Sequence, residues 1–311
     1  MARFATKACW VAGVLSLLCV AAGPLSEAGA AGADAAVPFP NAFAPNPGVA
    51  WLTRSTMFMP PPSGAGPVVQ DPARPHVSNE EFRDTGRQPT LPVADLNNPI
   101  LQPWVKEELR KRNELVLAGK GGFSRSANCW PVGVPAFSLL SIQPIFIIPG
   151  PKEVVMVWQG DHHQLRHIYL TDKHSAKVAP SWFGESIGHY ESGTLVVDTI
   201  GLSTRTFIDD YFTPHTEKLH VVERFRVIDG GKGLETAVHV EDPGAFTMPW
   251  DGIQRYQRVE PGVAENDTPR NPISGSTDAG PLIERDCAEN PFNYFGGSGD
   301  LPVPHTDRPD F

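Results

Sequence analysis

The sequence predicts a mainly β protein whose core is an antiparallel barrel or a two-sheet sandwich. Between residues 137 and 259, eight runs rich in β-branched and aromatic residues alternate with turn sequences such as Asp229-Gly230-Gly231. No helical segments alternate with these runs, which argues against a parallel α/β sheet. With 311 residues, the chain is long enough for one large domain or two small ones.

The predicted strands follow one another at short spacing, as in an antiparallel meander. Their expected ranges are 137–148, 153–159, 163–170, 187–191, 194–200, 218–228, 234–241 and 252–259. The residues around Ser192-Gly193 indicate a hairpin turn. Barrel and sandwich stay open as alternatives, because both show the same pattern of strands and turns.

The N-terminus has the three parts of a secretory signal peptide. Arg3 and Lys7 are followed by an uncharged apolar run over residues 8–22, and Ala28-Gly29-Ala30 is a plausible cleavage site. We therefore expect residues 1–30 to be removed and the protein to be periplasmic or extracellular. No later run is long and apolar enough for a membrane span.

The rest of the chain divides by composition. Residues 31–98 are rich in proline and predict an extended arm, because proline lacks the backbone donor that strands and helices use. Residues 99–118 predict one helix, with Asn98 as its cap and Gly119 just past its end. Residues 99–260 thus form a helix plus a β-rich core, and residues 261–311 form a loop-rich tail.

The charge balance restricts the partners. The chain carries a net charge of −9, and loss of Arg3, Lys7 and Glu27 would make it one unit more negative. This disfavours nucleic acid and anionic membranes, and leaves a small-molecule ligand or substrate. The sequence has no glycine-rich nucleotide fingerprint, so no nucleotide cofactor is expected. Its oligomeric state stays open.

Two cysteines would remain after cleavage, Cys129 and Cys287. In an oxidising compartment the simple expectation is one disulfide between them. The alternative is two free buried thiols.

Three segments resemble an uncharacterised family of secreted bacterial β-rich proteins. They are SWFGESIGHYESGTLVVDT, PHTEKLHVVERFR and VEDPGAFTMPW, and the resemblance covers about residues 129–250. The sequence departs from the family pattern at Ser192-Gly193, where the family has Gly-Asp. The resemblance implies a periplasmic or extracellular β-rich protein, and it brings no activity and no ligand set.

The richest cluster of acid/base groups lies in residues 214–226. Read as a strand, this segment places His215 and Glu217 on one face and His220 on the other. A carboxylate beside an imidazole makes a competent general base near neutral pH. We therefore expect His215 to be a catalytic base that Glu217 orients.

Two further charged residues stand among apolar neighbours, Arg166 and Asp198. A charge in such a setting needs a partner, so the two either pair with each other or Arg166 binds an anionic group. In the catalytic hypothesis, Arg166 stabilises developing negative charge, and His220 and Asp198 support it.

Other polar and aromatic residues complete the candidate site. A divalent metal is possible, and no other cofactor is expected. The residues expected to bind substrate are His163, His167, Tyr169, Trp182 and Trp250. The possible metal ligands are His174, Asp209, His215 and Glu217.

Together these features predict a secreted enzyme with a pocket in a β-barrel or sandwich. It would perform acid/base chemistry, as a lyase, isomerase or hydrolase, on a small polar or aromatic molecule. One alternative is a non-catalytic periplasmic ligand-binding or carrier protein. Another is a structural envelope protein in which the charged residues only form ion pairs.

Overall fold

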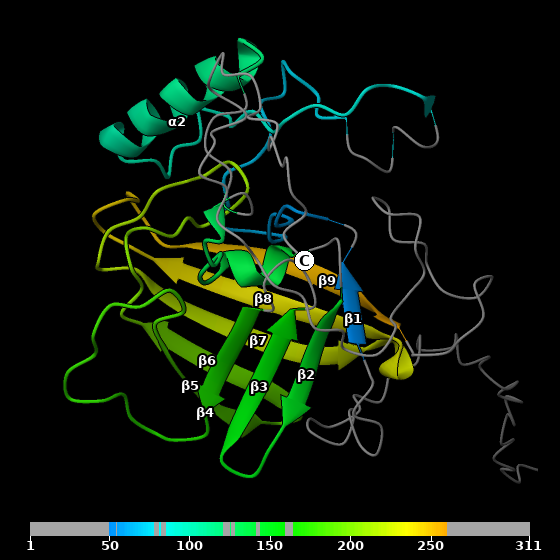
Figure 1. Ribbon diagram of the computed structural model, residues 1–311, viewed down its shortest axis with the longest axis vertical. Coiled ribbons are helices and arrows are strands. Elements are labelled where there is room, and N and C mark those ends of the chain that lie inside the picture. Colours follow the sequence, from blue (N-terminus) through cyan, green and yellow to red (C-terminus); the bar gives the residue numbers. More distant parts are fainter. Residues whose placement is uncertain are drawn as a thin grey trace, which may run out of the picture. The chain divides into compact units, whose positions relative to one another are not determined.

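The computed structural model describes residues 50–53, 55–77, 81, 85–120, 125, 128–140, 144–158 and 164–259. Within them nine strands form one closed barrel, each hydrogen-bonded to its neighbours in chain order (Figure 1). The mainly β prediction is confirmed, and of its two architectures the barrel is the one observed. All described residues belong to one compact unit, Asp34–Phe311.

The strands are short, and two turns of 3₁₀ helix and one α-helix accompany them. Their bounds are β1 (Ala50–Thr53), α2 (Pro103–Leu117), η3 (Ala136–Leu139), β2 (Ile145–Pro149), β3 (Glu153–Trp158), β4 (Gln164–Tyr169), β5 (Glu185–Glu191), β6 (Thr194–Ile200), β7 (His220–Ile228), η4 (Asp229–Gly231), β8 (Gly233–Glu241) and β9 (Trp250–Val259).

One pair of neighbouring strands in the barrel is parallel. Strand β4 pairs in parallel with β5 through Ile168–Ser186 and Tyr169–Ile187, while every other pair is antiparallel. A closed ring with an odd number of strands cannot alternate direction throughout, so at least one parallel pair is unavoidable. The predicted antiparallel meander is thus observed at every strand pair except this one.

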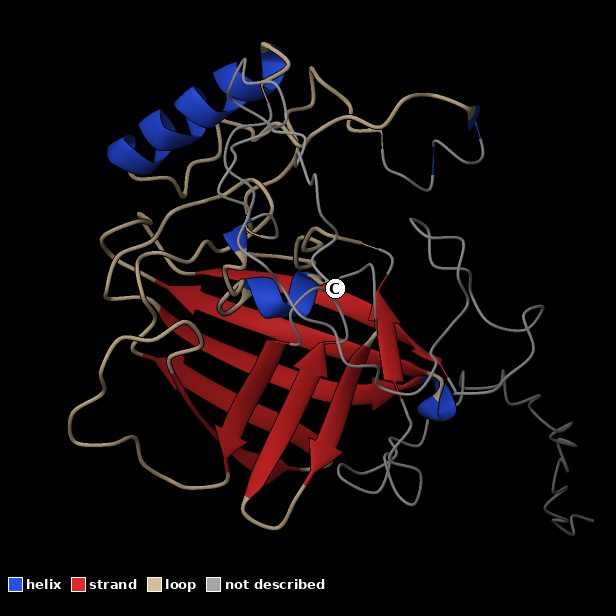
Figure 2. Ribbon diagram, in the orientation of Figure 1, coloured by secondary structure: helices blue, strands red, loops and turns tan. Residues whose placement is uncertain are grey.

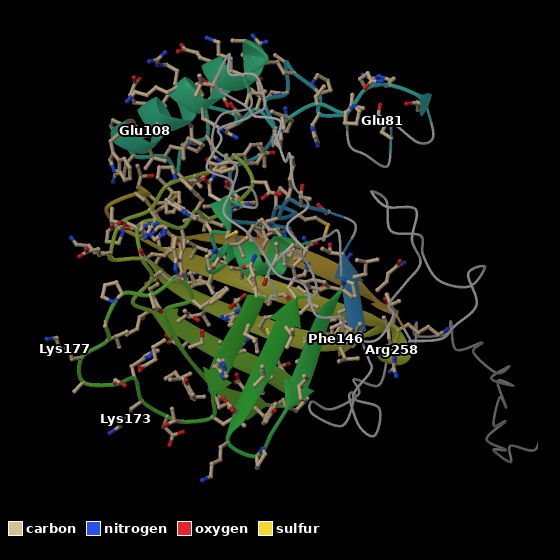
Figure 3. The ribbon with its side chains drawn as sticks, viewed as in Figure 1. Glu81, Glu108, Phe146, Lys173, Lys177 and Arg258 are labelled. Atoms are coloured by element: carbon tan, nitrogen blue, oxygen red, sulfur yellow. The ribbon has the colours of Figure 1, made fainter. Side chains whose placement is uncertain are left out.

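A parallel pair needs a connection that returns the chain to the starting end of the barrel. Residues 170–184 make this crossover between β4 and β5. Lys173 and Lys177 project from this segment, away from the barrel (Figure 3). The same loop carries His174, so the crossover determines where that imidazole lies.

Side chains alternate between the barrel interior and its outer face, as the two-residue period of a strand requires. In β7, Val221, Glu223 and Phe225 are buried, while Arg224 and Arg226 are exposed. The inward apolar residues pack into one core. Its fully buried members include Trp51, Phe137, Val154, Met156, Ile168, Leu195, Val197 and Phe225.

A second apolar cluster joins one end of the barrel to helix α2 and the N-terminal arm. Val105 and Leu109 of α2 are buried in the same cluster as Trp250. Phe58 of the arm packs against Trp250 with ring centroids 6.1 Å apart. The indole of Trp104 donates to the Gly244 carbonyl at 2.7 Å. Figure 2 shows helix α2 outside the strands of the barrel.

Two predicted boundaries change. The run predicted as a strand over 137–148 is divided into η3 and β2, with η3 inserted in the barrel core. Helix α2 begins at Pro103, because proline fits the first helical position and Gln102 is the cap. Asn98 instead donates its side-chain amide to the Pro67 carbonyl. The residue predicted to lie past the helix end, Gly119, has φ +70° as expected.

Strand β1 was not predicted, because its four residues lie within the proline-rich arm. The signal peptide, residues 31–49 of the arm and the tail 261–311 lie outside the described residues. Among the described helices, none has the length and apolar character needed to cross a membrane.

Candidate functional site

The charged residues singled out in the sequence are divided between the inside and the outside of the barrel. We call the inner group the interior polar cluster and the outer group the histidine–carboxylate row. The interior polar cluster consists of Ser138, Arg166, Ser186, Thr199, Glu223 and Tyr256. The histidine–carboxylate row consists of Glu185, His174, Asp198, His220, Glu241, His239 and Asp251.

An ion pair between Arg166 and Glu223 lies at the centre of the interior polar cluster. Both side chains have no exposed surface. The guanidinium also donates to Ser186 and Thr199, at 3.3 Å and 3.1 Å. The second carboxylate oxygen of Glu223 accepts from the Ser138 hydroxyl at 2.8 Å. The predicted requirement that Arg166 be paired is thus met inside the barrel.

The predicted partner of Arg166 was wrong. The sequence suggested Asp198, but Asp198 points out of the barrel because it is one residue away from the inward-facing Thr199. The partner is instead Glu223 on β7. Strands β5 and β6 separate β7 from β4, which carries Arg166. Since the pair is sealed from solvent, Arg166 cannot reach a dissolved substrate in this arrangement.

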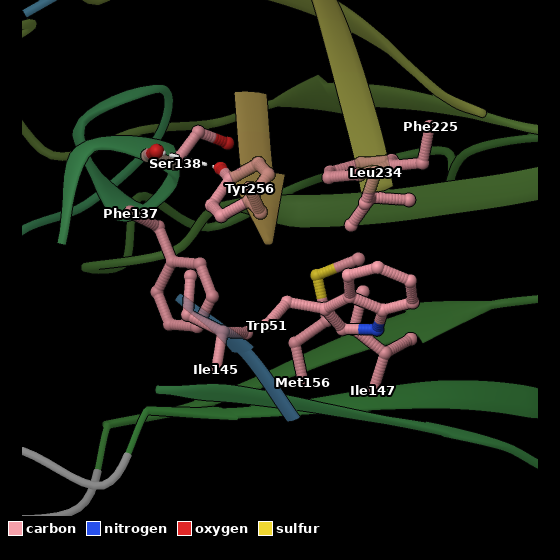
Figure 4. Close-up of a pocket in the computed structure, with 9 residues that line it drawn as sticks. All are labelled: Trp51, Phe137, Ser138, Ile145, Ile147, Met156, Phe225, Leu234 and Tyr256. Atoms are coloured by element: carbon pink, nitrogen blue, oxygen red, sulfur yellow. Dashed lines mark hydrogen bonds between the residues drawn. The ribbon is translucent and has the colours of Figure 1, made fainter. Parts of the chain in front are cut away.

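A small cavity lies in the barrel core beside this cluster (Figure 4). Its volume is about 10 Å³, close to the space that one water molecule needs. The Tyr256 hydroxyl at its edge donates to the Ser138 carbonyl at 2.6 Å, and burial raises the pKa of that phenol. Pockets for small-molecule ligands are usually 300–1,000 Å³. This cavity therefore does not match the predicted binding pocket.

His215, the predicted base, lies in a turn before β7 and is buried. Its Nδ1 lies 2.9 Å from the Thr216 carbonyl, and its Nε2 lies 2.8 Å from the Thr206 hydroxyl. A carbonyl only accepts, so Nδ1 carries the hydrogen. The Thr206 hydroxyl also lies 2.9 Å from the Ser203 carbonyl, so it has a single hydrogen for its contacts with that carbonyl and with Nε2. Burial lowers the pKa of His215, although Thr216 and Asp242 oppose the shift.

The predicted pairing of His215 with Glu217 is wrong. Strand β7 begins only at His220, so the two residues do not share a strand face. Glu217 is exposed in the turn, and both ring nitrogens of His215 have other partners. The arrangement of His215 is that of a satisfied core histidine.

The four predicted metal ligands also lie apart. Asp209 is buried and accepts from the amides of Tyr211 and Thr213, and burial raises its pKa to about 6. His215 and Glu217 have the positions described above, and His174 belongs to the row. Among the described residues, no group of three or more His, Cys, Asp or Glu side chains is arranged to hold a metal ion as it stands.

The histidine–carboxylate row crosses the outer face of the barrel from β5 to β9. Strand register places its members side by side, because His220 is opposite Glu241 and His239 is opposite Asp251. His174 reaches the row from the crossover loop. Each imidazole thus lies between two carboxylates contributed by different parts of the chain.

The centre of the row is the carboxylate of Asp198. Its Oδ1 lies 3.0 Å from Nε2 of His174 and 3.0 Å from Nε2 of His220. On the far side of His174, Nδ1 lies 2.9 Å from Glu185. On the far side of His220, Nδ1 lies 3.5 Å from Glu241, the longest nitrogen–oxygen contact in the row.

The far end of the row is His239, which lies 3.1 Å from Glu241 and 2.8 Å from Asp251. Burial alone would lower the pKa of His239, but the hydrogen bonds to Asp251 and Glu241 outweigh it and raise that pKa. Hydrogen bonds from His239 first and His220 second lower the pKa of Glu241. At this end of the row, the charges of Glu241, His239 and Asp251 therefore affect one another.

The row is open to solvent, in contrast to the interior polar cluster. The exposed fraction of its side chains ranges from 18% for His174 to 53% for Asp251. Asp198 is 41% exposed and His220 is 34% exposed. Imidazoles held by carboxylates at an accessible surface are able to exchange protons with a ligand or bind a cation.

The residues predicted to bind substrate do not form one site. His167 and Tyr169 stack on the outer face of β4, at 6.2 Å between ring centroids, and His167 also pairs with Glu153. Trp182 packs near Trp130 with the Arg205 guanidinium over it. Trp250 is buried in the core next to Phe58 and Phe246, so its predicted role is corrected to a structural one. His163 lies outside the described residues.

Sequence reasoning found three members of the row, namely His174, Asp198 and His220, but placed His174 in a different group. It missed the others: Glu185, His239, Glu241 and Asp251. A face-by-face reading of strands 234–241 and 252–259 places His239 and Glu241 on one face, and this signal could have drawn attention to them.

No protein-family model matches this chain, and it has no significant match among curated proteins or solved structures.

Proposed function

We propose that the protein is a secreted enzyme that performs acid/base chemistry at the histidine–carboxylate row, on a small polar or aromatic molecule. His220 would be the general base, and Asp198 would hold it. The observation that carries the proposal is the pair of contacts made by the His220 ring, 3.0 Å to Asp198 and 3.5 Å to Glu241.

The two contacts differ in a way that suits a base. When Nε2–H donates to Asp198, Nδ1 keeps its lone pair, and its 3.5 Å distance to Glu241 is longer than an ordinary N–H···O hydrogen bond. Catalytic hydrogen bonds are often long before substrate arrives. In the proposed reaction, Nδ1 takes a proton from water or from a substrate C–H bond, and Asp198 stabilises the resulting imidazolium.

The proposal moves the base from His215 to His220 and leaves Arg166 out of the site. The alternative is a non-catalytic ligand-binding or carrier protein. A cavity of about 10 Å³ gives no support to carriage inside the barrel core. A bound ligand would then lie elsewhere, and the row is a surface where it could be held.

Two small aromatic probes test the chemistry. Release of 4-nitrophenol from 4-nitrophenyl acetate reports hydrolysis, and deuterium exchange into acetophenone reports proton abstraction from carbon. A positioned general base contributes about 10²- to 10⁴-fold. We expect the wild type to accelerate one of these reactions, and His220→Ala to lose about that factor.

His167→Ala is the matched control, because His167 is also an outward imidazole with a carboxylate partner, Glu153, at 2.9 Å. It should keep the wild-type rate. Equal rates for wild type, His220→Ala and His167→Ala would contradict the proposal, since any surface histidine would then do as well.

The secreted location is part of the proposal, and so is a disulfide between Cys129 and Cys287. The disulfide is supported by Cys129, which is disulfide-bonded. Cys287 lies outside the described residues. Peptide mapping of the non-reduced protein would identify the partner. A Cys129 peptide linked to any other cysteine would contradict the pairing.

A further inference from the structure

We infer that the C-terminal tail, from residue 260 to Phe295, lies as a strap across the outer face of the barrel, over strands β9, β1, β2 and β3. The disulfide between Cys129 and Cys287 would hold the far end of this strap. The inference goes beyond the proposed catalysis and takes only that disulfide from the proposed function.

Its basis is a set of apolar residues that stand in register across the four strands. Trp51, Ile145 and Trp158, which are their neighbours in sequence, belong to the barrel core. Neighbouring residues of a strand point to opposite faces and paired residues to the same face, so the set points outward. We call it the outer apolar stripe: Val259 of β9, Ala50 and Leu52 of β1, Phe146 of β2 (labelled in Figure 3) and Val157 of β3.

The outer apolar stripe is buried although it points away from the core. Its five residues have exposed fractions between 0% and 6%. By contrast, Arg224 and Arg226 on the outer face of β7 are exposed. The described members of this cluster all come from the four strands themselves, with Val155 of β3 at its edge. This points to a cover from a part of the chain outside the described ranges.

Two such segments begin beside the stripe. Strand β1 starts at Ala50 and β9 ends at Val259, and these two residues pair. Residues 31–49 and the tail therefore both start within reach of it. The disulfide favours the tail, because Cys129 is disulfide-bonded and, once the signal peptide is removed, Cys287 of the tail is the remaining cysteine.

Cys129 lies toward the opposite end of the stripe. Val132, three residues after it, donates its amide hydrogen to the side chain of Gln164 at 2.9 Å. The residue after Gln164 pairs with Val157 of the stripe. The stripe therefore leads from Val259, where the tail leaves the barrel, toward this cysteine.

The tail has the length and the composition for this path. Neighbouring strands lie about 4.8 Å apart, so the four steps from β9 to β4 measure roughly 19 Å. The 27 residues from 260 to 286 can extend to roughly 90 Å. Leu282 and Ile283 stand shortly before Cys287, and Phe292 and Phe295 shortly after it. Burial of these apolar side chains against the stripe would stabilise the strap.

Photo-cross-linking of the full chain tests the inference. Phe146→4-azidophenylalanine keeps an aromatic ring at the centre of the stripe and adds an azide that, on irradiation, bonds to the group lying against it. Trypsin digestion and mass spectrometry then identify the linked peptide. We expect peptides from residues 271–311, which carry the apolar residues of the tail.

Tyr169→4-azidophenylalanine is the matched control, because Tyr169 is also an aromatic residue on the outer face and is half exposed. It should give no link to the tail. A link from Phe146 to residues 31–49, to a second copy of the chain or to no peptide would overturn the inference, and so would equal yields of tail peptide from both positions. If the Phe146 variant fails to fold, Val155→4-azidophenylalanine decides, since Val155 lies at the half-buried edge of the same cluster.

Reduction with dithiothreitol before irradiation tests the disulfide as the clamp. The yield of tail peptide should fall several-fold, because the freed end meets the stripe at a lower effective concentration. An unchanged yield would contradict the clamp.

Failure of this inference and failure of the proposed function give different results. His220→Ala should remove turnover without changing the cross-linking yield. A tail link together with Cys129 paired to another cysteine would count against the proposed disulfide and leave the strap in place.

Discussion

The interior polar cluster and the histidine–carboxylate row are built from the same kinds of residue on the same strands. Glu223 and His220 both lie in β7, and Thr199 and Asp198 are neighbours in β6. Neighbouring residues of a strand point to opposite faces, so the interior polar cluster is buried and the row is exposed to solvent. Charges in the first group fix the packing, whereas those in the second can exchange partners.

The largest expected effect is in the interior. Arg166→Met leaves the Glu223 carboxylate buried without its ion pair, and breaking a buried pair costs about 3–5 kcal/mol. Urea unfolding should show a loss of this size in the free energy of unfolding.

The double variant Arg166→Met/Glu223→Leu sharpens this result. It removes both charges, and replacement of a buried pair by apolar groups is often neutral or stabilising. We expect it to be more stable than Arg166→Met alone. Destabilisation equal to the sum of the two single changes would show that the groups do not act as a pair.

The next largest effect is expected for His215→Ala. This variant tests whether His215 stabilises the fold or takes part in catalysis. His215→Ala removes the ring that the Thr216 carbonyl contacts, and it leaves the Thr206 hydroxyl with the Ser203 carbonyl alone. The expected loss is about 1–3 kcal/mol in the free energy of unfolding, with turnover per folded molecule unchanged. Unchanged stability with lost turnover would restore His215 as the base.

His215 also contributes a pH dependence whose sign follows from its lowered pKa. In the unfolded chain the imidazole binds a proton near its ordinary pKa of 6.5, whereas in the fold it does so only at lower pH. Its contribution to stability is complete above 6.5 and decreases as pH falls toward the folded value. Thermal melts between pH 7.5 and 5 should show a weaker pH dependence for His215→Ala than for the wild type.

A smaller effect on stability is expected in the row. Asp198→Asn changes an exposed contact, so the free energy of unfolding should move by less than about 1 kcal/mol. Turnover should nevertheless fall at least ten-fold. Glu153→Gln, which changes the carboxylate beside His167, should leave turnover unchanged. A large loss of stability in Asp198→Asn would show that the row, like the interior polar cluster, stabilises the fold.

The smallest effect is expected for Arg224→Ala. Arg224 lies on the outer face of β7, as His220 does, and pairs with Glu191, with both side chains about half exposed. Its removal should change the free energy of unfolding by no more than about 0.5 kcal/mol. Turnover should stay within two-fold of the wild type, and a ten-fold change would show that charge anywhere on this face controls turnover.

Strand identity and side-chain direction could be predicted from the sequence, because both depend on local alternation. Arg166 inward with Ile168, and His167 outward with Tyr169, follow from the period of two and are observed. Glu223, Arg224 and Arg226 on β7 each form an ion pair in the structure.

Partnership between distant strands could not be predicted in the same way. The pairing of Arg166 with Glu223 depends on how the barrel closes and on strands β5 and β6, which lie between β4 and β7. No local sequence pattern encodes this arrangement. The meeting of His174 with Asp198 depends on the path of the crossover loop. His215 was misplaced because a turn, not the strand, holds it, and side-chain alternation ends where β7 begins.

The closing contact of the barrel joins its first strand to its last. Ala50 pairs with Val259, and Thr53 pairs with Tyr256, so roughly 200 residues separate the partners along the chain. A growing polypeptide can therefore form its hairpins early, but it completes the ring only after β9 has left the ribosome. Contacts of such long sequence separation form slowly, and until then β1 and β8 present unpaired edges. A chain truncated before Trp250 should aggregate on release instead of forming a smaller barrel.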